Sequence, residues 1–258
     1  MREPFGRPRP VTASAPHTGA PPGGFEAGAD EPQWGIPDAV GGWLVAQVAA
    51  VFGGAVVLAV VGYNSADDIL SVVAVLQALL WVGLRGAPVL AGRRKGQGVV
   101  SDFGLSFRPI DVPVGLAIGV VCQFVLVPLV SLPWLELLGK DTDDLSQPAQ
   151  DLADKATDPL GVGLLVLIVV MGAPVVEELF FRGLLQRSVS RRIGAVGAVA
   201  ITAVVFGLTH FQPLQVPALA AFGAVLGLLA LRTGRLGPGI VAHLAFNAVT
   251  VIALLVDS

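Results

Sequence analysis

The chain has 258 residues, of which 14 % are charged, well below the roughly 25 % of a typical soluble domain. Apolar residues make up 54 % and the mean hydropathy is +0.76. Because apolar area left in water costs free energy, this composition excludes a soluble single domain. The net charge of −3 without a basic stripe argues against nucleic-acid binding. The single cysteine, Cys122, excludes a disulfide-stapled fold.

The N-terminal segment, residues 1–38, is rich in proline and glycine and carries scattered charges of both signs. It contains no apolar run long enough for the core of a signal peptide. It also cannot bury enough apolar surface to offset the entropy lost on ordering it. We therefore expect a disordered, uncleaved tail in which His17 has no functional part.

The rest of the chain contains apolar segments long enough to cross a bilayer as helices, which takes about 20 residues. Charges and turn residues separate seven of them, at 39–62, 69–91, 112–138, 159–189, 194–212, 214–232 and 237–256. Their apolar runs are continuous, whereas the strands of a membrane barrel would alternate over about 10 residues. The sequence predicts an all-α polytopic membrane bundle, with three N-terminal helices over 39–138 and a four-helix core over 159–256.

The orientation follows from the loops, because cytoplasmic loops carry the excess of Lys and Arg. Basic residues precede the first segment and follow the second, fourth and sixth, whereas loop 139–158 has six aspartates against two lysines. This pattern predicts a cytoplasmic N-terminus and a C-terminus outside. The excess of arginine over lysine and the richness in Ala, Val and Gly favour a bacterial cell membrane as the location.

Ionisable side chains inside a span are costly and mark functional sites by default. Glu178 and Arg182 are four residues apart, share a helix face and are predicted to form an ion pair. At 100° per residue, Glu177 points about 140° away from Arg182, so its carboxyl is free to face the bundle interior. His243 and Asn247 likewise project together from the last span.

The fourth and fifth spans place His210 at the same depth in the membrane as Glu177. His210 and Glu177 are equally far from the turn near 191–194, so an antiparallel hairpin would bring their side chains level. The neutral amides Gln47, Gln77 and Gln123 lie in the first three spans. We expect them to form hydrogen bonds between helices.

Three motifs in the last hundred residues carry a family resemblance: EELFFR at 177–182, FGLTH at 206–210 and HLAFN at 243–247. They resemble the EExxxR, FxxxH and HxxxN signatures of the CPBP intramembrane proteases, which include the type II CAAX prenyl proteases and the Abi-like membrane proteins. The resemblance covers about residues 159–256 and does not extend to the first three spans.

The resemblance implies hydrolysis of a peptide bond in a membrane-associated protein or peptide, prenylated or leader-bearing. It also implies a role for each motif residue, with Glu177 as the general base that activates water, aided by His210. His243 and Asn247 would stabilise the oxyanion. The supporting residues would be Glu178 and Arg182, which hold the fourth span in place, and Phe206, which packs beneath His210.

Metal dependence and two other function classes stay open at this point. Glu177, His210 and His243 would be the ligands if Zn²⁺ took part, yet there is no HExxH motif, and a glutamate base needs no metal, so we expect no cofactor. A non-enzymatic immunity or scaffold protein of the same fold is the main alternative. A transporter is less favoured, because the chain shows no internal repeat.

Overall fold

The computed structural model describes residues 32–61 and 70–257, and all regular structure in this part of the chain is helical. The helices are α1 (Ile36–Val61), α3 (Leu70–Lys95), α4 (Val99–Phe103), α5 (Asp111–Val121), η1 (Cys122–Leu126), α6 (Val127–Leu138), α7 (Thr142–Ala153), α8 (Pro159–Leu165), η2 (Val166–Gly172), α9 (Ala173–Glu177), η3 (Glu178–Leu185), α10 (Gln186–Ile193), α11 (Ala195–Leu208), α12 (Val216–Thr233) and α13 (Gly237–Asp257). The segments named η are π-helical. The predicted all-α helix bundle is confirmed.

Within the described residues, six helical rods are long and apolar enough to cross a membrane. Two of them contain π-helical segments: α5, η1 and α6 run together, and so do α8 through α10. The predicted fifth span forms α11, which has only 14 residues and is therefore about 21 Å long at 1.5 Å per residue. The count of seven spans and the cytoplasmic N-terminus stay predictions.

The tail predicted over residues 1–38 extends too far toward the first helix. Trp34 is 3 % exposed, and its ring centroid lies 4.8 Å from that of Phe103. The guanidinium of Arg191 lies over the same indole at 4.1 Å. A single tryptophan buries enough apolar area to anchor a short segment, and average composition does not reveal this. Residues 1–31, with His17, lie outside the described residues.

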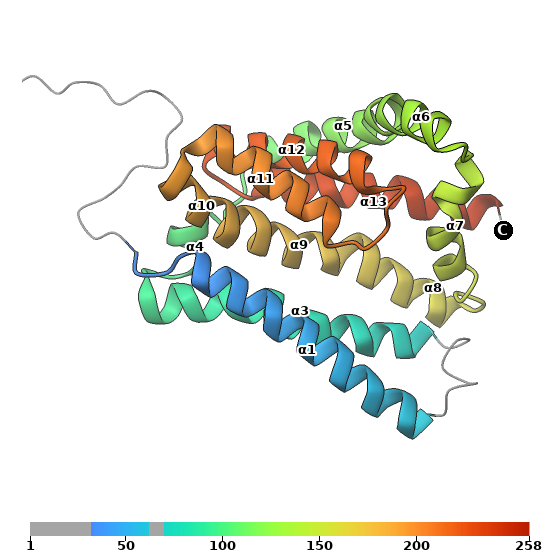
Figure 1. Cartoon of the computed structure of the whole chain (residues 1–258), viewed down its shortest axis with the longest axis horizontal. Coiled ribbons are helices and arrows are strands. Elements are labelled where there is room, and N and C mark those ends of the chain that lie inside the picture. The colour runs from blue at the N-terminus through green and yellow to red at the C-terminus, as the bar shows by residue number, and fades with distance from the viewer. Residues whose placement is uncertain (1–31, 62–69, 258) are drawn as a thin grey trace, which may run out of the picture.

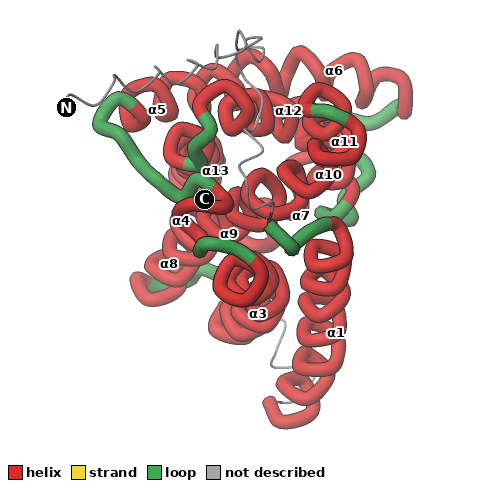
Figure 2. The backbone as a smooth tube through the Cα atoms, turned by 90° about the vertical axis from the view of Figure 1, so that its left-hand side faces the viewer, coloured by secondary structure: helices red, strands yellow, loops and turns green. Residues whose placement is uncertain are grey.

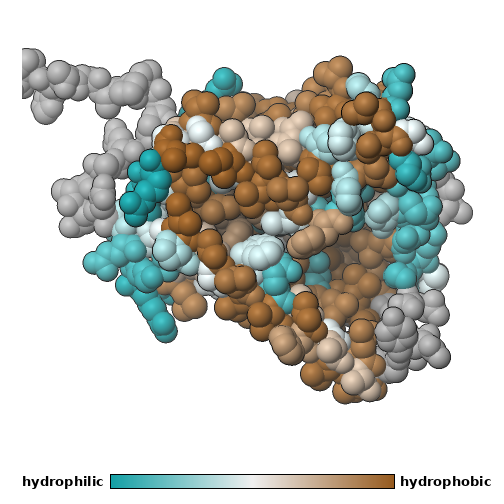
Figure 3. Space-filling view, in the orientation of Figure 1, coloured by the Kyte–Doolittle hydropathy of each residue, from teal (hydrophilic) through white to brown (hydrophobic). Residues whose placement is uncertain are grey.

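The long helices lie roughly side by side, and α7 crosses one end of the bundle (Figure 1). The hairpin of α1 and α3 lies at one side, with α1 at the periphery (Figures 1 and 2). On the face shown in Figure 3, hydrophobic residues cover the middle, and hydrophilic residues gather toward the two ends. This distribution suits a bundle whose middle lies in lipid and whose ends reach water.

The α1–α3 hairpin is held by small residues at its crossing. A Cβ built on Gly83 would lie 2.3 Å from the backbone nitrogen of Ala46, and one built on Gly42 would lie 2.2 Å from the Cβ of Ala87. In lipid, where apolar burial gives little driving force, close backbone approach of this kind supplies the dispersion contacts that join helices.

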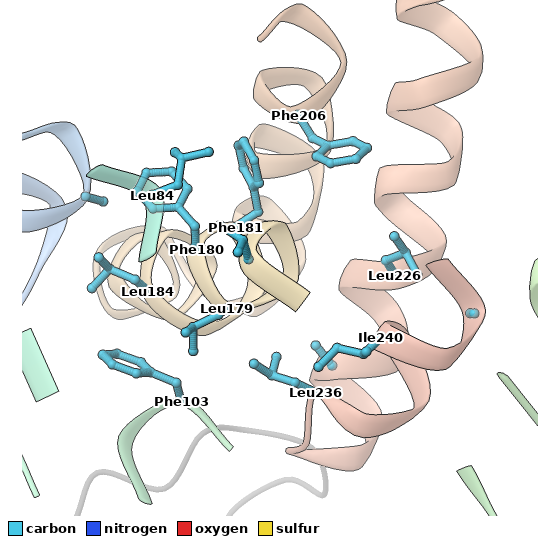
Figure 4. Close-up of a cluster of buried hydrophobic side chains, with 14 of the residues drawn as sticks. Leu84, Phe103, Leu179, Phe180, Phe181, Leu184, Phe206, Leu226, Leu236 and Ile240 are labelled. Carbon is cyan, nitrogen blue, oxygen red and sulfur yellow. The ribbon is translucent and has the colours of Figure 1, made fainter. Parts of the chain in front are cut away.

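A compact apolar core joins the η3 segment to α4, α11, α12 and α13. Its buried members include Phe103, Phe180, Phe181, Leu184, Phe206, Leu226, Leu236 and Ile240 (Figure 4). Because these side chains come from several helices, the core fixes the rotation of the rod that carries the predicted catalytic carboxylates. It thereby decides which of the two adjacent glutamates faces which neighbour.

Candidate active site

The predicted ion pair between Glu178 and Arg182 is confirmed, and it is buried. Glu178 is 0 % exposed and Arg182 1 %, and the distance from Arg182 Nη1 to Glu178 Oε1 is 2.8 Å. The guanidinium also lies 4.3 Å from the ring centroid of Phe206, and its Nη2 donates a hydrogen bond to the carbonyl of Gly223 at 3.2 Å. Each charge therefore has an opposite charge, as burial in a low dielectric requires.

A second polar side chain repeats this contact one turn further along the rod. Gln186 is 0 % exposed and donates through Nε2 to the carbonyl of Gly227 at 3.0 Å. Arg182 and Gln186 are thus four residues apart on one helix and bind carbonyls four residues apart on α12. The glycines let α12 approach closely, and the two hydrogen bonds set its register. Gln186 was not among the predicted site residues, although it lies four residues after Arg182 in the sequence.

His243 lies between the two glutamates of the first motif. Its Nδ1 is 3.1 Å from Oε1 of Glu178, and its Nε2 is 3.9 Å from Oε2 of Glu177. Because the Glu178 carboxylate accepts, Nδ1 carries the hydrogen. Glu178 therefore orients the imidazole so that Nε2 faces Glu177. Helical spacing predicted only that His243 and Asn247 project together, and it did not predict this contact.

The side chain of Glu177 has no salt bridge to Arg182 and is 15 % exposed. It lines a cavity of about 310 Å³ that the predicted partner His210 also lines. The residues around this cavity come from α1, α3, the α9–η3 region and the end of α11; they are Trp43, Gln47, Gln77, Leu80, Leu84, Glu177, Phe181, Thr209, His210 and Phe211. The structure thus brings Glu177 and His210 to one space without a direct hydrogen bond between the two side chains.

His210 is held in one orientation by its own helix. Its Nδ1 donates to the carbonyl of Phe206 at 2.7 Å, and its ring stands edge-on to the Phe206 ring at a centroid distance of 4.8 Å. With the hydrogen on Nδ1, the lone pair of Nε2 is the group available to the cavity. Phe206 therefore packs against His210, as the sequence analysis expected.

Asn247 makes a contact that differs from its expected one. Its Nδ2 donates to the carbonyl of Val169 at 2.8 Å, and it does not line the cavity. The Val169 carbonyl lacks a helical donor because Pro174, five residues on, has no N–H, and the N–H of Ala173 bonds Ile168 instead. Asn247 thus joins α13 to η2, and its role as an oxyanion donor stays a prediction.

Two of the three glutamines that were expected to form hydrogen bonds between helices line the cavity instead. Gln47 and Gln77 line the cavity, and neither carboxamide is hydrogen-bonded to any group within the described ranges 32–61 and 70–257. The third amide, Gln123, has a buried Oε1 without a partner there. The expectation that these three glutamines bond between helices is therefore wrong. Amide position alone does not reveal whether a side chain meets a partner or a cavity.

The end of α11 contributes the remaining wall. Phe211, directly after His210, has φ of 54°, a left-handed conformation that is a rare one for a bulky residue. The turn redirects the chain from α11 into α12 and leaves Phe211 69 % exposed beside the cavity. No pattern in the sequence predicts this conformation.

The three residues expected as ligands if Zn²⁺ took part do not form a metal site in this geometry. In the part of the chain that the structure describes, no three His, Cys, Asp or Glu side chains converge as metal ligands would. Nδ1 of His243 is committed to Glu178, and Nδ1 of His210 to a backbone carbonyl. These hydrogen bonds leave Nε2 of each imidazole open, so it is the spacing of Glu177, His210 and His243 that does not match a zinc site in this geometry.

One comparison with known proteins gives a match. Residues 159–249 match the family model described as type II CAAX prenyl endopeptidase Rce1-like. No curated protein and no solved structure matches the chain. The matched region runs from the start of α8 into α13 and contains all three motifs, whereas α1 and α3 lie outside it.

Proposed function

We propose an activity from one premise, that the match of residues 159–249 to the Rce1-like model of type II CAAX prenyl endopeptidases extends to their chemistry. The protein is an intramembrane endopeptidase that hydrolyses a peptide bond of a membrane-associated protein or peptide, with water activated by Glu177. The substrate is prenylated or leader-bearing. The plasma membrane of a bacterial cell is the proposed location.

The observation that carries this proposal is the different surroundings of two adjacent carboxylates. Glu178 is fully buried and bound to Arg182 and His243, so it is occupied in holding other groups. Glu177 faces the cavity together with the lone pair of His210 Nε2. A carboxylate and an imidazole that line the same small cavity are groups that can act in general-base catalysis.

In the proposed reaction, a water molecule in the cavity donates one hydrogen bond to Glu177 and the other to Nε2 of His210. Glu177 takes a proton as the water oxygen bonds to the carbonyl carbon of the substrate, which becomes a tetrahedral oxyanion. When the C–N bond breaks, that proton passes from Glu177 to the leaving nitrogen. The first products are a carboxylic acid and an amine, and transfer of the acid's proton to the amine leaves a carboxylate and an ammonium group.

His243 supplies the electrostatic support in this proposal. His243 itself is not among the residues that line the cavity. With Nδ1–H donated to Glu178, its other nitrogen lies 3.9 Å from Oε2 of Glu177, and in the proposed reaction the protonated imidazole donates Nε2–H to the oxyanion as it forms beside Glu177. One donor of this kind contributes about 3 kcal/mol of transition-state stabilisation. Glu178 thereby acts on the reaction through His243, as a positioning residue.

The test is cleavage of an internally quenched peptide with a farnesylated C-terminal Cys-aliphatic-aliphatic sequence, by the full chain in proteoliposomes, beside the unprenylated peptide and a leader-type peptide. Glu177→Gln should lower kcat/KM at least about 100-fold, because general-base catalysis contributes that much. Glu136→Gln is the matched control, since Glu136 is an exposed carboxylate of another rod. Equal cleavage by wild type and Glu177→Gln contradicts the role proposed for Glu177, whereas no cleavage of any of the three peptides by wild type favours a non-enzymatic scaffold.

A further inference from the structure

The cavity that holds Glu177 has a wall that the family match does not include. Gln47 of α1 and Gln77 of α3 line it, although the match begins at residue 159. Neither carboxamide has a hydrogen-bond partner among residues 32–61 and 70–257. Their carboxamide atoms are not among the buried polar atoms that lack a partner, so both amides are open to the cavity and can bond to a group that enters it.

Helical spacing turns both amides to the same side. Trp43 and Gln47 are four residues apart on α1, and Gln77 is followed on the same face of α3 by Leu80 and Leu84; all five side chains line the cavity. Each helix therefore presents an amide beside apolar groups. Glu177 and His210 stand on the facing wall of the same space.

The chemistry of this wall selects the ligand. A carboxamide both donates and accepts hydrogen bonds, as a peptide group does. A phosphate or carboxylate ligand would call for Arg or Lys, and no Arg or Lys is among the residues that line the cavity. The volume of about 310 Å³ is at the lower end of the range for ligand sites, which suits one short extended segment of chain.

We propose that Gln47 and Gln77 bind the backbone amides of the peptide segment that is cleaved, and that the α1–α3 hairpin forms the second wall of the substrate site. The carboxamides hold the peptide groups next to the scissile bond, and Trp43, Leu80 and Leu84 contact its apolar side chains. The inference rests on the proposed function and adds the residues that position its substrate.

The test uses the quenched farnesylated peptide with the full chain in proteoliposomes. Gln47→Leu and Gln77→Leu should each raise KM about fivefold, and together about twenty-five-fold, with little change in kcat, because each removes about one hydrogen bond made in the bound state. Gln123→Leu is the matched control: it removes an amide from a span but not from the cavity, and its KM should equal that of wild type.

Peptides with one ester in place of one amide near the scissile bond make the test specific. At one position the ester should weaken binding to wild type about fivefold and leave binding to Gln47→Leu or Gln77→Leu unchanged, because the same hydrogen bond is already lost. Ester effects equal in wild type and both variants would overturn the inference, as would KM values that match Gln123→Leu.

Binding separates this inference from the proposed reaction. The fluorescent uncleaved peptide is titrated against Glu177→Gln protein in nanodiscs, with and without each glutamine change. A fivefold rise in Kd for each change supports the peptide-binding wall even if wild type shows no hydrolysis. Unchanged Kd values overturn it even if Glu177-dependent hydrolysis is found.

Discussion

The two regions of this molecule are held together by different forces. The region from α8 to α13 contains a buried ion pair, an imidazole bound to one of its partners, and side chains of Arg182 and Gln186 that reach carbonyls on a neighbouring helix. The α1–α3 hairpin has an ion pair between Asp38 and Lys95 at one end, but along its length it contains close contacts between small residues and amides without partners. Directional bonds fix the proposed catalytic groups, whereas dispersion contacts hold most of the facing wall.

Breaking the buried pair should cost the most. Arg182→Met leaves the Glu178 carboxylate buried with only His243 as partner, so we expect the free energy of unfolding to fall by about 4 kcal/mol. The measurement is reversible unfolding in mixed detergent micelles. The free energy of unfolding of Arg182→Lys should lie between those of wild type and Arg182→Met. Lysine keeps the charge but lacks the planar guanidinium that bonds both Glu178 and Gly223. A loss under about 1 kcal/mol for Arg182→Met would show that the pair contributes no more than a surface one.

Separating the hairpin should cost somewhat less and should leave the other region intact. Gly83→Val would push side-chain atoms into the backbone of Ala46 and Gly42, which should destabilise the hairpin by about 3 kcal/mol. Hydrogen exchange should rise in α1 and α3 but not in α12. Gly86→Ala is the control, because a Cβ there meets nothing within 4 Å. Equal exchange in both regions would mean that they unfold as one unit.

Removing the Asn247 amide should have a smaller effect on the first region. Asn247→Leu leaves the Val169 carbonyl without its donor, and a buried carbonyl without a partner costs about 2 kcal/mol. Unfolding in mixed micelles measures the loss, and Asn247→Gln tests whether a longer amide restores it. If Asn247→Leu keeps its stability and loses kcat more than 100-fold, the oxyanion role is favoured over the structural one.

The smallest effect concerns α7, which belongs to neither region and lies outside the spans. Hydrogen bonds from the Lys140 ammonium and from the backbone N–H of Asp141 hold the pKa of Asp144 below its ordinary value. Its contribution to helix stability is therefore complete above the unfolded-state pKa of about 4 and is lost as the pH falls through the lowered pKa. The protection of the α7 amides, measured as exchange relative to the intrinsic rate at each pH, should fall over that window in wild type. In Asp144→Asn the protection should be low throughout, and an unchanged pH profile would contradict the assignment.

The sequence predicted those features that depend on one helix at a time. The i,i+4 spacing predicted the ion pair of Glu178 and Arg182. The angle between Glu177 and Arg182 on the helix predicted that Glu177 faces away from this pair. The apolar runs predicted the long helices, because the length and composition of a segment are enough to indicate a membrane-spanning helix. The antiparallel hairpin brought Glu177 and His210 to one level, and both line the cavity.

The features that the sequence did not predict depend on rotations between helices. His243 meets Glu178 rather than acting with Asn247 alone because the core sets how α13 faces the η3 segment. Asn247 meets Val169 because the π-helical path around Pro174 leaves that carbonyl without a donor. The amides of Gln47 and Gln77 face a cavity, and only the packing of two helices against a third decides that.

Cleavage of the farnesylated peptide in heavy-oxygen water tests the central claim most directly. Mass spectrometry of the products from wild type, Glu136→Gln and Glu177→Gln reports both the cut bond and the origin of the new carboxylate oxygen. We expect one heavy oxygen in the new C-terminus with wild type and Glu136→Gln, and no product above background with Glu177→Gln. The same labelled product at an undiminished rate from Glu177→Gln would contradict this claim.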